Sequence, residues 1–544
     1  MTTQAALRTP GTVRTRARAA WRPAVVVLAA TGLFALYWRQ SESVTVSSDG
    51  AGNVLQAWAM LHGNLLLHGW RVSDVSFYTT ELPQYALIES VLGLGAQVVH
   101  VGAAMTYTLL VLLAACLAKG SARGRAGWAR ALLAAGIMVA PQLSATQIVL
   151  LSPDHTGTTV LVLVTWLVID RVTPDRWKAA RWLVPLVVFV LLTWTMIADS
   201  IVLVTCIAPL ILVCLIRACP GLIRHGERPA PRGYELSLAA AAAAAGGLGS
   251  AAPRIIHALG GYRQAPVEPD TTVTALQHQA WVTFQAVLEL FGANMYGVRP
   301  VIEAVFVWLH LAGVIVVLCA LGLALGRLFR FQDLVIPVFA VAIVFNLVTY
   351  MFSAHALDIL GAREIAAVLP LGAVLAGRVL AEPLLKLARA TRSARRWLLP
   401  ALAVIAVGYV GTLAYGAAQP PAPLTNQPLA SWLVAHGLTD GLAAYWQANS
   451  TALASSGRVQ VSGVTLAPSG QFVPYEWETD DAGYDPARHD ATFLVADGPA
   501  QLRWMQSAAL RTFGPPQRTY SYDGYTIMVW DANLLRRLGH PGLV

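Results

Sequence analysis

The sequence predicts an α-helical polytopic membrane protein with a small α/β domain at its C-terminal end. Its 544 residues are 56% hydrophobic and only 12% charged, and the mean hydropathy is +0.57. Soluble domains carry about twice that charged fraction. The apolar residues fall in long runs separated by short basic segments, whereas residues 431–544 have ordinary polarity. A bundle of membrane helices followed by one polar domain accounts for this pattern.

The membrane part extends over residues 22–417 and contains about eleven apolar segments, each near the ~20 residues that cross the hydrocarbon. The predicted spans are 22–38, 84–118, 131–150, 156–170, 183–198, 200–217, 236–252, 301–325, 334–352, 365–381 and 398–417. The second run is longer than one span requires, and Gly93 and Gly95 predict a break within it.

The basic residues predict the orientation of these spans. The N-terminal basic tail, 1–21, with the adjoining Arg22, and the loops on its side hold 25 of the 38 Lys and Arg residues, and the opposite loops hold six. By the positive-inside rule, the N-terminus is cytoplasmic and the long loops 39–82 and 253–300 face outward. The cytoplasmic membrane is the expected location. Because the charges are clustered between apolar runs and not on one face, a nucleic-acid partner is not expected.

The polar C-terminal part, 431–544, follows a proline-rich linker at 418–430. Apolar alternation predicts strands over 458–466, 491–497 and 525–531, and a helix over 501–513. An odd number of spans places this α/β domain outside. Trp446, Trp477 and Trp504 could stack on sugars, but packing in the core of the domain is the favoured interpretation.

A polar stretch, S-S-D-G-A-G-N, follows the first span and contains Asp49. A carboxylate at the surface of an otherwise apolar protein is costly unless it has a function. Asp49 is therefore a candidate general base, because a carboxylate can take the proton of an attacking hydroxyl group. The alternative is that Asp49 caps a helix starting at Ala51. One residue could do both.

Other outward polar residues are candidates for binding a substrate. Asp154 and His155 follow Pro153 in a short loop, where they could hold a divalent metal or position an acceptor or phosphate. They could equally cap the next span. Asp199 interrupts two apolar runs and is expected in a tight outer turn near the same cavity. His62 is interpreted as interfacial, with lining of the site as its alternative.

Three local patterns resemble the GT-C glycosyltransferases, the membrane enzymes that take sugars from polyprenyl-phosphate carriers. Asp49, Gly63 and the L-P-Q-Y around Pro83 resemble the acidic residue, glycine and proline motif of the protein O-mannosyltransferase and aminoarabinose-transferase branch. Arg363 and Pro370 in G-A-R-E-I-A-A-V-L-P resemble its late arginine and proline, and P-D-H-T-G-T its second outer loop. The usual acidic pair is here Asp49-Gly50, and the usual double proline is single.

The resemblance implies a GT-C-like fold and a transferase of the cell envelope. It would move a sugar from a polyprenyl-phosphate donor to a glycan, lipid or protein acceptor, with inversion and with Asp49 as the base. Arg363 is favoured to stabilise the leaving phosphate, with Arg263 second. Snorkelling at the interface is the alternative for each arginine. A divalent metal is the one candidate cofactor.

Two other classes of function stay open. A transporter or flippase would usually show internal repeats, and none is evident. A non-catalytic envelope assembly protein would fit the missing acidic neighbour of Asp49. The alanine-rich composition, with more arginine than lysine, resembles that of a high-GC actinobacterium.

Overall fold

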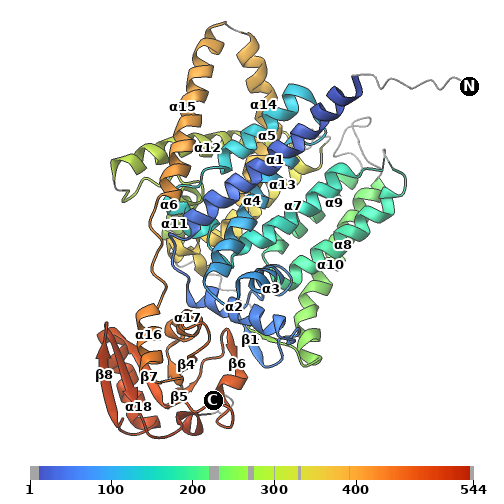
Figure 1. The fold of residues 1–544 in the computed structure, drawn as a ribbon. Helices are drawn as coiled ribbons and strands as arrows, with labels where there is room; N and C mark the ends of the chain where they lie inside the picture. The colour runs from blue at the N-terminus through green and yellow to red at the C-terminus, as the bar shows by residue number, and fades with distance from the viewer. Residues whose placement is uncertain are drawn as a thin grey trace, which may run out of the picture.

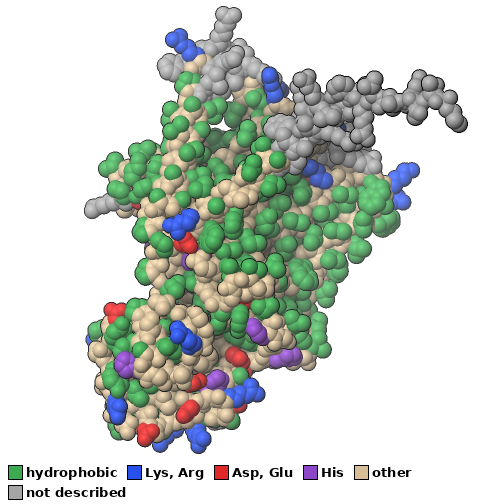
Figure 2. Space-filling view, viewed as in Figure 1, with side chains coloured by type: hydrophobic (Ala, Val, Ile, Leu, Met, Phe, Trp, Pro, Cys, Tyr) green, Lys and Arg blue, Asp and Glu red, His purple; other side chains and the backbone are tan. Residues whose placement is uncertain are grey.

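The computed structural model describes residues 11–174, 177–219, 232–266, 275–298, 300–328, 333–390 and 392–539. The first ten residues of the predicted basic tail and the middle of the loop 253–300 lie outside these ranges. The chain forms a bundle of helices and, at one end of it, a compact domain with a β-sheet (Figure 1). Hydrophobic side chains cover most of the visible side of the bundle, Lys and Arg side chains lie on both the bundle and the domain, and acidic side chains gather mostly over the domain (Figure 2).

Each predicted span coincides with a helix or with a broken pair of helices. The bundle contains α1 (Gly11–Ser41), α4 (Gln97–Lys119), α5 (Gly124–Met138), α7 (His155–Arg171), α8 (Ala180–Ala198), α9 (Ala208–Ala218), α10 (Arg232–Ala258), α12 (Val301–Gly326), α13 (Val335–Met351), α14 (Val368–Ala390) and α15 (Arg392–Ala417). Seven of the described helices are long and apolar enough to cross a membrane, and eight if one bent pair counts as a span. How many helices cross stays a prediction.

Two spans are broken. The predicted break in the second span is confirmed: α3 (Glu81–Leu92) ends at Gly93, whose φ of 75° suits glycine, and α4 begins at Gln97. The span predicted over 131–150 is wrong as one helix, because α5 and α6 (Leu143–Val149) meet at 101°. Pro141 lies in their connection, and a proline has no amide hydrogen with which to continue a helix.

The loops assigned to the inside meet at the end of the bundle that lies away from the sheet domain. The buried Arg378 donates to the Leu117 carbonyl at 2.9 Å and pairs with Asp170 at 2.8 Å. It also pairs with Asp333. The C-terminal ends of α4 and α7 and the segment before α13 are thereby held around one cation, as expected if they share a side.

The opposite end carries shorter helices: α2 (Ser48–Leu61), α3, α6, α11 (Leu276–Leu290), the π-helical turn η1 (Leu203–Ile207), and the 3-10 turns η2 (Ala354–Leu357) and η3 (Ile359–Ile365). A three-stranded sheet joins both long loops to the sheet domain. In it β1 (Trp70–Val72) pairs in parallel with β2 (Arg263–Gln264) and antiparallel with β6 (Thr479–Asp480). The loops 39–82 and 253–300 therefore lie on the same side as the domain.

The C-terminal domain contains a six-stranded mixed sheet in the order β5-β4-β3-β7-β9-β8. Its strands are β3 (Asp440–Ala443), β4 (Gln460–Leu466), β5 (Phe472–Pro474), β7 (Phe493–Asp497), β8 (Arg518–Tyr522) and β9 (Tyr525–Val529). Its helices are α16 (Gln427–Ala435), α17 (Tyr445–Ala454) and α18 (Gly498–Thr512), with 3-10 turns η4 (Asp481–Tyr484) and η5 (Leu534–Arg537). The three predicted strands and the predicted helix correspond to β4, β7, β9 and α18.

The expectation that all three tryptophans pack in the core of this domain is wrong for two of them. Trp504 packs against the core cluster, but Trp446 is 56% exposed. Trp446 follows Tyr445 on α17, and adjacent helical residues point in different directions. Because Tyr445 points toward the bundle, Trp446 is turned away from it. Trp477 lines a cavity at the junction with the bundle.

Candidate functional site

A cavity of about 400 Å³ lies between the helix bundle and the C-terminal domain. Its wall is contributed by α2, the loop after β1, the start of α7, the link from α8 to η1, the turns η2 and η3, and the segment before β6. The carboxylates on this wall are those of Asp49, Asp74, Asp154, Asp199, Glu364 and Glu478, and the basic side chains are those of His155, His355 and Arg363. Asp49, Asp154, His155, Asp199 and Arg363, all predicted as site residues, meet here.

Asp49 lies in the first turn of α2 but does not cap that helix. The cap is Ser47, whose hydroxyl oxygen accepts from the amide of Gly50 at 3.2 Å. The interpretation of Asp49 as the cap is therefore wrong, because the helix begins three residues before Ala51. Asp49 Oδ1 instead accepts a hydrogen bond from the hydroxyl of Tyr445 in the C-terminal domain. The carboxylate still benefits from the positive end of the helix dipole.

Asp154 is the N-cap of α7, as one of its two interpretations predicts. Its Oδ1 accepts from the amide of His155 at 2.7 Å. Its Oδ2 is buried and has no hydrogen-bond partner among the residues that the structure describes. A buried carboxylate oxygen without a partner is costly. Asp154 can therefore receive a hydroxyl group of a ligand in the cavity while it caps the helix.

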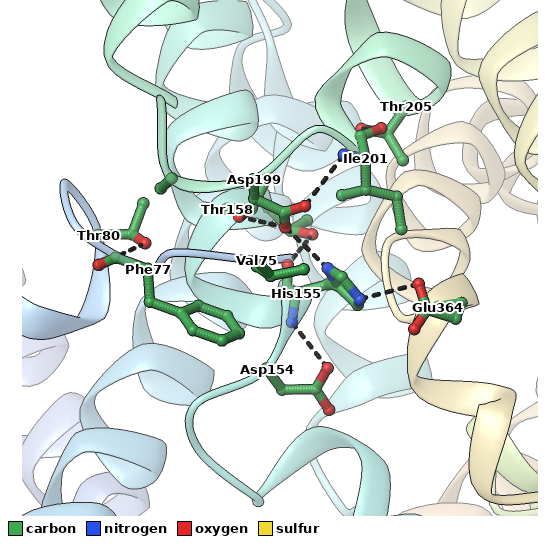
Figure 3. A network of polar contacts seen from close by, with 12 residues as sticks. Val75, Phe77, Thr80, Asp154, His155, Thr158, Asp199, Ile201, Thr205 and Glu364 are labelled. Carbon is green, nitrogen blue, oxygen red and sulfur yellow. Dashed lines mark hydrogen bonds and ion pairs between the residues drawn. The ribbon is translucent and has the colours of Figure 1, made fainter. Parts of the chain in front are cut away.

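His155 links three segments of the cavity wall, as Figure 3 shows. Its Nδ1 lies 2.7 Å from Asp199 Oδ2, and its Nε2 lies 2.9 Å from Glu364 Oε2. Thr158 donates to the same Asp199 oxygen at 2.7 Å, and Asp199 Oδ1 accepts from the amide of Ile201 at 3.0 Å. The start of α7, the end of α8 and the turn η3 are held together by this network.

The same network weakens the hypothesis of a divalent metal at Asp154 and His155. Both ring nitrogens of His155 are occupied by carboxylates, so neither is free to coordinate a cation. Within the described ranges, no group of three or more His, Cys, Asp or Glu side chains is arranged to hold a metal ion. The donor set does not fit a metal.

Arg363, on η3, faces the cavity as a free cation. Its guanidinium makes no hydrogen bond or ion pair with any residue described in the structure, whereas the carboxylate of its neighbour Glu364 is held by His155. Burial lowers the pKa of the Arg363 guanidinium. The pKa of the guanidinium is nevertheless raised, because the charges of nearby carboxylates outweigh this effect. These carboxylates belong to Asp154, Glu364, Asp49 and Asp74. Arg363 is exposed and lines the cavity, so an anionic ligand in the cavity could reach it.

Two predicted site residues lie elsewhere. His62 ends α2 in an exposed position, where its Nδ1 lies 2.8 Å from the Trp58 carbonyl oxygen. Arg263 is exposed on β2. Neither lines the cavity, so the structure does not bring them together with Asp49.

Several residues at the cavity are not among those predicted from the sequence. Glu364 follows Arg363 directly, so the G-A-R-E pattern could have suggested it. Glu478 lies on the wall and comes from the C-terminal domain, where the acidic and aromatic run Y-E-W-E-T-D-D gave a signal for it. Tyr445, from the same domain, bonds to Asp49 beside the cavity and had no such signal. Their proximity to Asp49 depends on how the domain docks. Arg71 on β1 fixes that docking through ion pairs with Glu476 at 2.5 Å and Asp481 at 2.7 Å.

No known protein family and no curated protein matches the sequence. The fold, however, is similar to solved structures. ArnT from Cupriavidus metallidurans bound to undecaprenyl phosphate aligns with a TM-score of 0.56 at 13% identity, over 95% of this chain and 98% of that one. Its apo form aligns with a TM-score of 0.55 at 14% identity, over 96% and 99% of the two chains.

An oligosaccharyltransferase from Archaeoglobus fulgidus, in complex with Zn and sulfate, aligns with a TM-score of 0.50 at 12% identity. That alignment covers 94% of this chain and 73% of the archaeal one. At these identities the similarity concerns the fold. The chain is a multi-pass membrane protein with the GT-C fold, as the sequence predicts, and its C-terminal part forms a sheet domain.

Proposed function

We propose that the protein is a membrane glycosyltransferase that moves a sugar from a polyprenyl-phosphate donor to a cell-envelope acceptor on the outer face of the cytoplasmic membrane. The observation that carries this proposal is the cavity in which Asp49, Asp154 and Arg363 meet from three separate loops. Its volume of about 400 Å³ is within the range of small-molecule sites. The GT-C fold supports the same reaction class, and the distribution of basic residues supports the outer face.

Asp49 is the proposed general base. The hydroxyl oxygen of the acceptor attacks the anomeric carbon of the sugar while its proton passes to the Asp49 carboxylate. The bond from the anomeric carbon to the phosphate oxygen breaks, and the lipid phosphate leaves with the electron pair. One displacement without a protein nucleophile inverts the anomeric centre. Since Oδ1 of Asp49 is held by Tyr445, Oδ2 is the oxygen left for the acceptor.

Arg363 is proposed to stabilise the departing phosphate. That group gains negative charge as the bond breaks, and a guanidinium can donate two hydrogen bonds to a phosphate. The network of His155 with Asp199 and Glu364 holds η3 against α7, so Arg363 has a fixed support. A structure of ArnT contains undecaprenyl phosphate, which supports a polyprenyl-phosphate carrier for the donor here.

Asp154 and Trp477 are proposed to bind the sugar or the acceptor. The Oδ2 of Asp154 can accept from a hydroxyl group, because no described residue donates to it. Trp477 adds an aromatic side chain to a wall that is otherwise rich in carboxylates. An aromatic ring presents an apolar face against which the C–H groups of a sugar can pack.

The substitution Asp49→Asn tests the proposal. Purified full-length protein in lipid nanodiscs is supplied with labelled polyprenyl-phosphate sugars and envelope acceptors, and the transferred label is measured. We expect Asp49→Asn to lose roughly 100-fold or more of the rate, since general-base catalysis contributes on that order. Asp523→Asn, in the exposed hairpin between β8 and β9, is the control and should transfer normally.

Two results would contradict the proposal. Full activity of Asp49→Asn would remove the general base. An absence of transfer by the wild-type protein, together with unchanged envelope glycans in a deletion strain, would favour the transporter or the assembly protein.

A further inference from the structure

We infer that the C-terminal domain completes the catalytic site: Tyr445 and a protonated Glu478 form a hydrogen-bonded chain onto Asp49 and leave Asp49 as the one anion of the three. The inference rests on the proposed role of Asp49 as the base. Tyr445 and Glu478 act through Asp49, so they are positioning residues. The carboxylate that is missing beside Asp49 in sequence is then supplied by a distant domain.

The hydrogen-bonded chain from Glu478 through Tyr445 to Asp49 has two short, consecutive contacts. Tyr445 is the first residue of α17, and its hydroxyl donates to Asp49 Oδ1. The same hydroxyl oxygen lies 3.1 Å from Glu478 Oε2. Tyr445 thus stands between two carboxyl groups, one from α2 of the membrane part and one from its own domain.

The number of available protons decides how these contacts are made. A tyrosine hydroxyl has a single proton and can donate to only one of the two carboxyl groups. If both carboxyl groups were ionised, the second would face the tyrosine oxygen with no hydrogen between them. A proton on Glu478 Oε2 removes this conflict, because Glu478 then donates to Tyr445 while Tyr445 donates to Asp49.

The other contacts of Glu478 agree with that assignment. Its Oε1 accepts from the side-chain amide of Asn53 at 3.0 Å, so Oε1 is the carbonyl oxygen and Oε2 is free to carry the proton. The side-chain amide of Asn449 donates to the backbone carbonyl oxygen of Glu478 at 2.9 Å and holds this segment in place. Asp49 and Asn53 lie in one turn of α2, and that turn contacts the tyrosine and the glutamate together.

The backbone at this point is also specialised. Glu478 has a φ of 45°, in the left-handed region that residues with a side chain rarely adopt. Strained backbone of this kind tends to persist at functional sites. Gly52 faces it: a Cβ added to Gly52 would lie 2.5 Å from Glu478 Oε2 and 2.9 Å from Asn449 Nδ2. Gly52, in the polar stretch after the first span, therefore leaves space for the side chain of Glu478, which lies 425 residues after Asn53.

Burial and charge favour the proton on Glu478. Glu478 is 2% exposed, and burial together with the charge of Asp49 raises the pKa of its carboxyl well above the usual range. Hydrogen bonds with Tyr445, Asn53 and Ser73 lower this pKa and offset only part of the rise. The titratable groups around it are Asp49 on α2, Tyr85 on α3, Tyr445 on α17, and Tyr475 just before it. No described cation bonds to it. Active sites often contain two nearby carboxyl groups of which one is ionised and acts as the base while the other is protonated and neutral.

Two substitutions in the full-length protein test the chain through the pH dependence of kcat/KM. Glu478→Gln places an amide where the neutral acid stands, so we expect transfer within about threefold of wild type and loss of the alkaline limb of the profile. Tyr445→Phe removes a donor to a charged group, which is worth roughly tenfold to a hundredfold in kcat. Its acid limb should move to higher pH. Tyr522→Phe, at a 37% exposed tyrosine, is the matched control.

Two outcomes would overturn the inference while the wild type transfers sugar. The first is a loss with Glu478→Gln as deep as that with Asp49→Asn, because Glu478 would then act as an anion. The second is a Tyr445→Phe variant with the rate and the pH profile of the wild type.

Thermal unfolding against pH tests the proton on Glu478 without any activity. At pH values between the ordinary pKa of a glutamate and the raised pKa of Glu478 in the folded protein, the folded state binds more protons than the unfolded state. The stability from this proton is therefore complete below the ordinary pKa and falls as pH rises through the folded pKa. Glu478→Gln should remove that fall. If the wild type has no transferase activity but its stability falls with pH in this way, the proposed function fails and the proton assignment stands. If the stability of the wild type and that of Glu478→Gln depend equally on pH, the assignment is rejected.

Discussion

The substitution Gly52→Ala offers a direct test of how the C-terminal domain meets the membrane part. In an open helix, alanine in place of glycine stabilises by about 1 kcal/mol. At Gly52 the added Cβ would lie 2.5 Å from Glu478 Oε2 and 3.2 Å from Glu478 Cβ, so Glu478 must shift. Overpacking of this kind costs roughly 1–3 kcal/mol, and the hydrogen bond from Asn53 is worth about 1 kcal/mol more.

The expected net effect is a destabilisation of roughly 1–3 kcal/mol, together with at least a tenfold loss of sugar transfer. Gly247→Ala is the matched control, because Gly247 lies within α10 and a Cβ there would meet nothing within 4 Å. Thermal unfolding in one detergent and the nanodisc transfer assay measure both variants. A Gly52→Ala protein as stable and as active as Gly247→Ala would refute the close contact between α2 and Glu478.

Two further predictions concern the cavity wall. Arg363→Gln should lower kcat/KM for the lipid-linked donor roughly tenfold to a hundredfold, since a hydrogen bond to a charged group is lost. Arg263→Gln is the control, because Arg263 lies outside the cavity. Equal losses for both variants in the transfer assay would argue against a phosphate site at Arg363. His155→Ala should cost about 3–5 kcal/mol of stability, because it leaves the carboxylates of Asp199 and Glu364 without their shared partner. His62→Ala should be nearly neutral in the same unfolding measurement, and similar midpoints for both histidine variants would contradict this reasoning.

The membrane architecture was predictable because its signals are local. Each apolar run forms helix from its own composition, and the break after Leu92 follows from Gly93 itself, whose φ is 75°. The cap at Asp154 needs only the amide of the next residue, at 2.7 Å. The bend of 101° between α5 and α6 was missed because hydropathy is insensitive to the direction of a chain.

The candidate site was predictable in part. Asp49, Asp154, Asp199 and Arg363 could be selected because polar side chains in outward loops of an apolar chain are few, and all four line one cavity. His62 and Arg263 satisfied the same criterion and lie outside it. The criterion identifies which side chains lie at the end of the bundle that carries the sheet domain, but not which of them share a wall.

The sequence by itself determined the helical class, the grouping of the loops by side and the position of Asp49 in the first turn after a span. Only the tertiary structure decided that Tyr445 and Glu478 reach Asp49, and that Gly52 and Asn53 serve Glu478. The reason is physical. Hydropathy and helix capping act within a few residues, whereas a contact across 425 residues depends on the docking of two folded parts, here through Arg71 and the sheet of β1, β2 and β6.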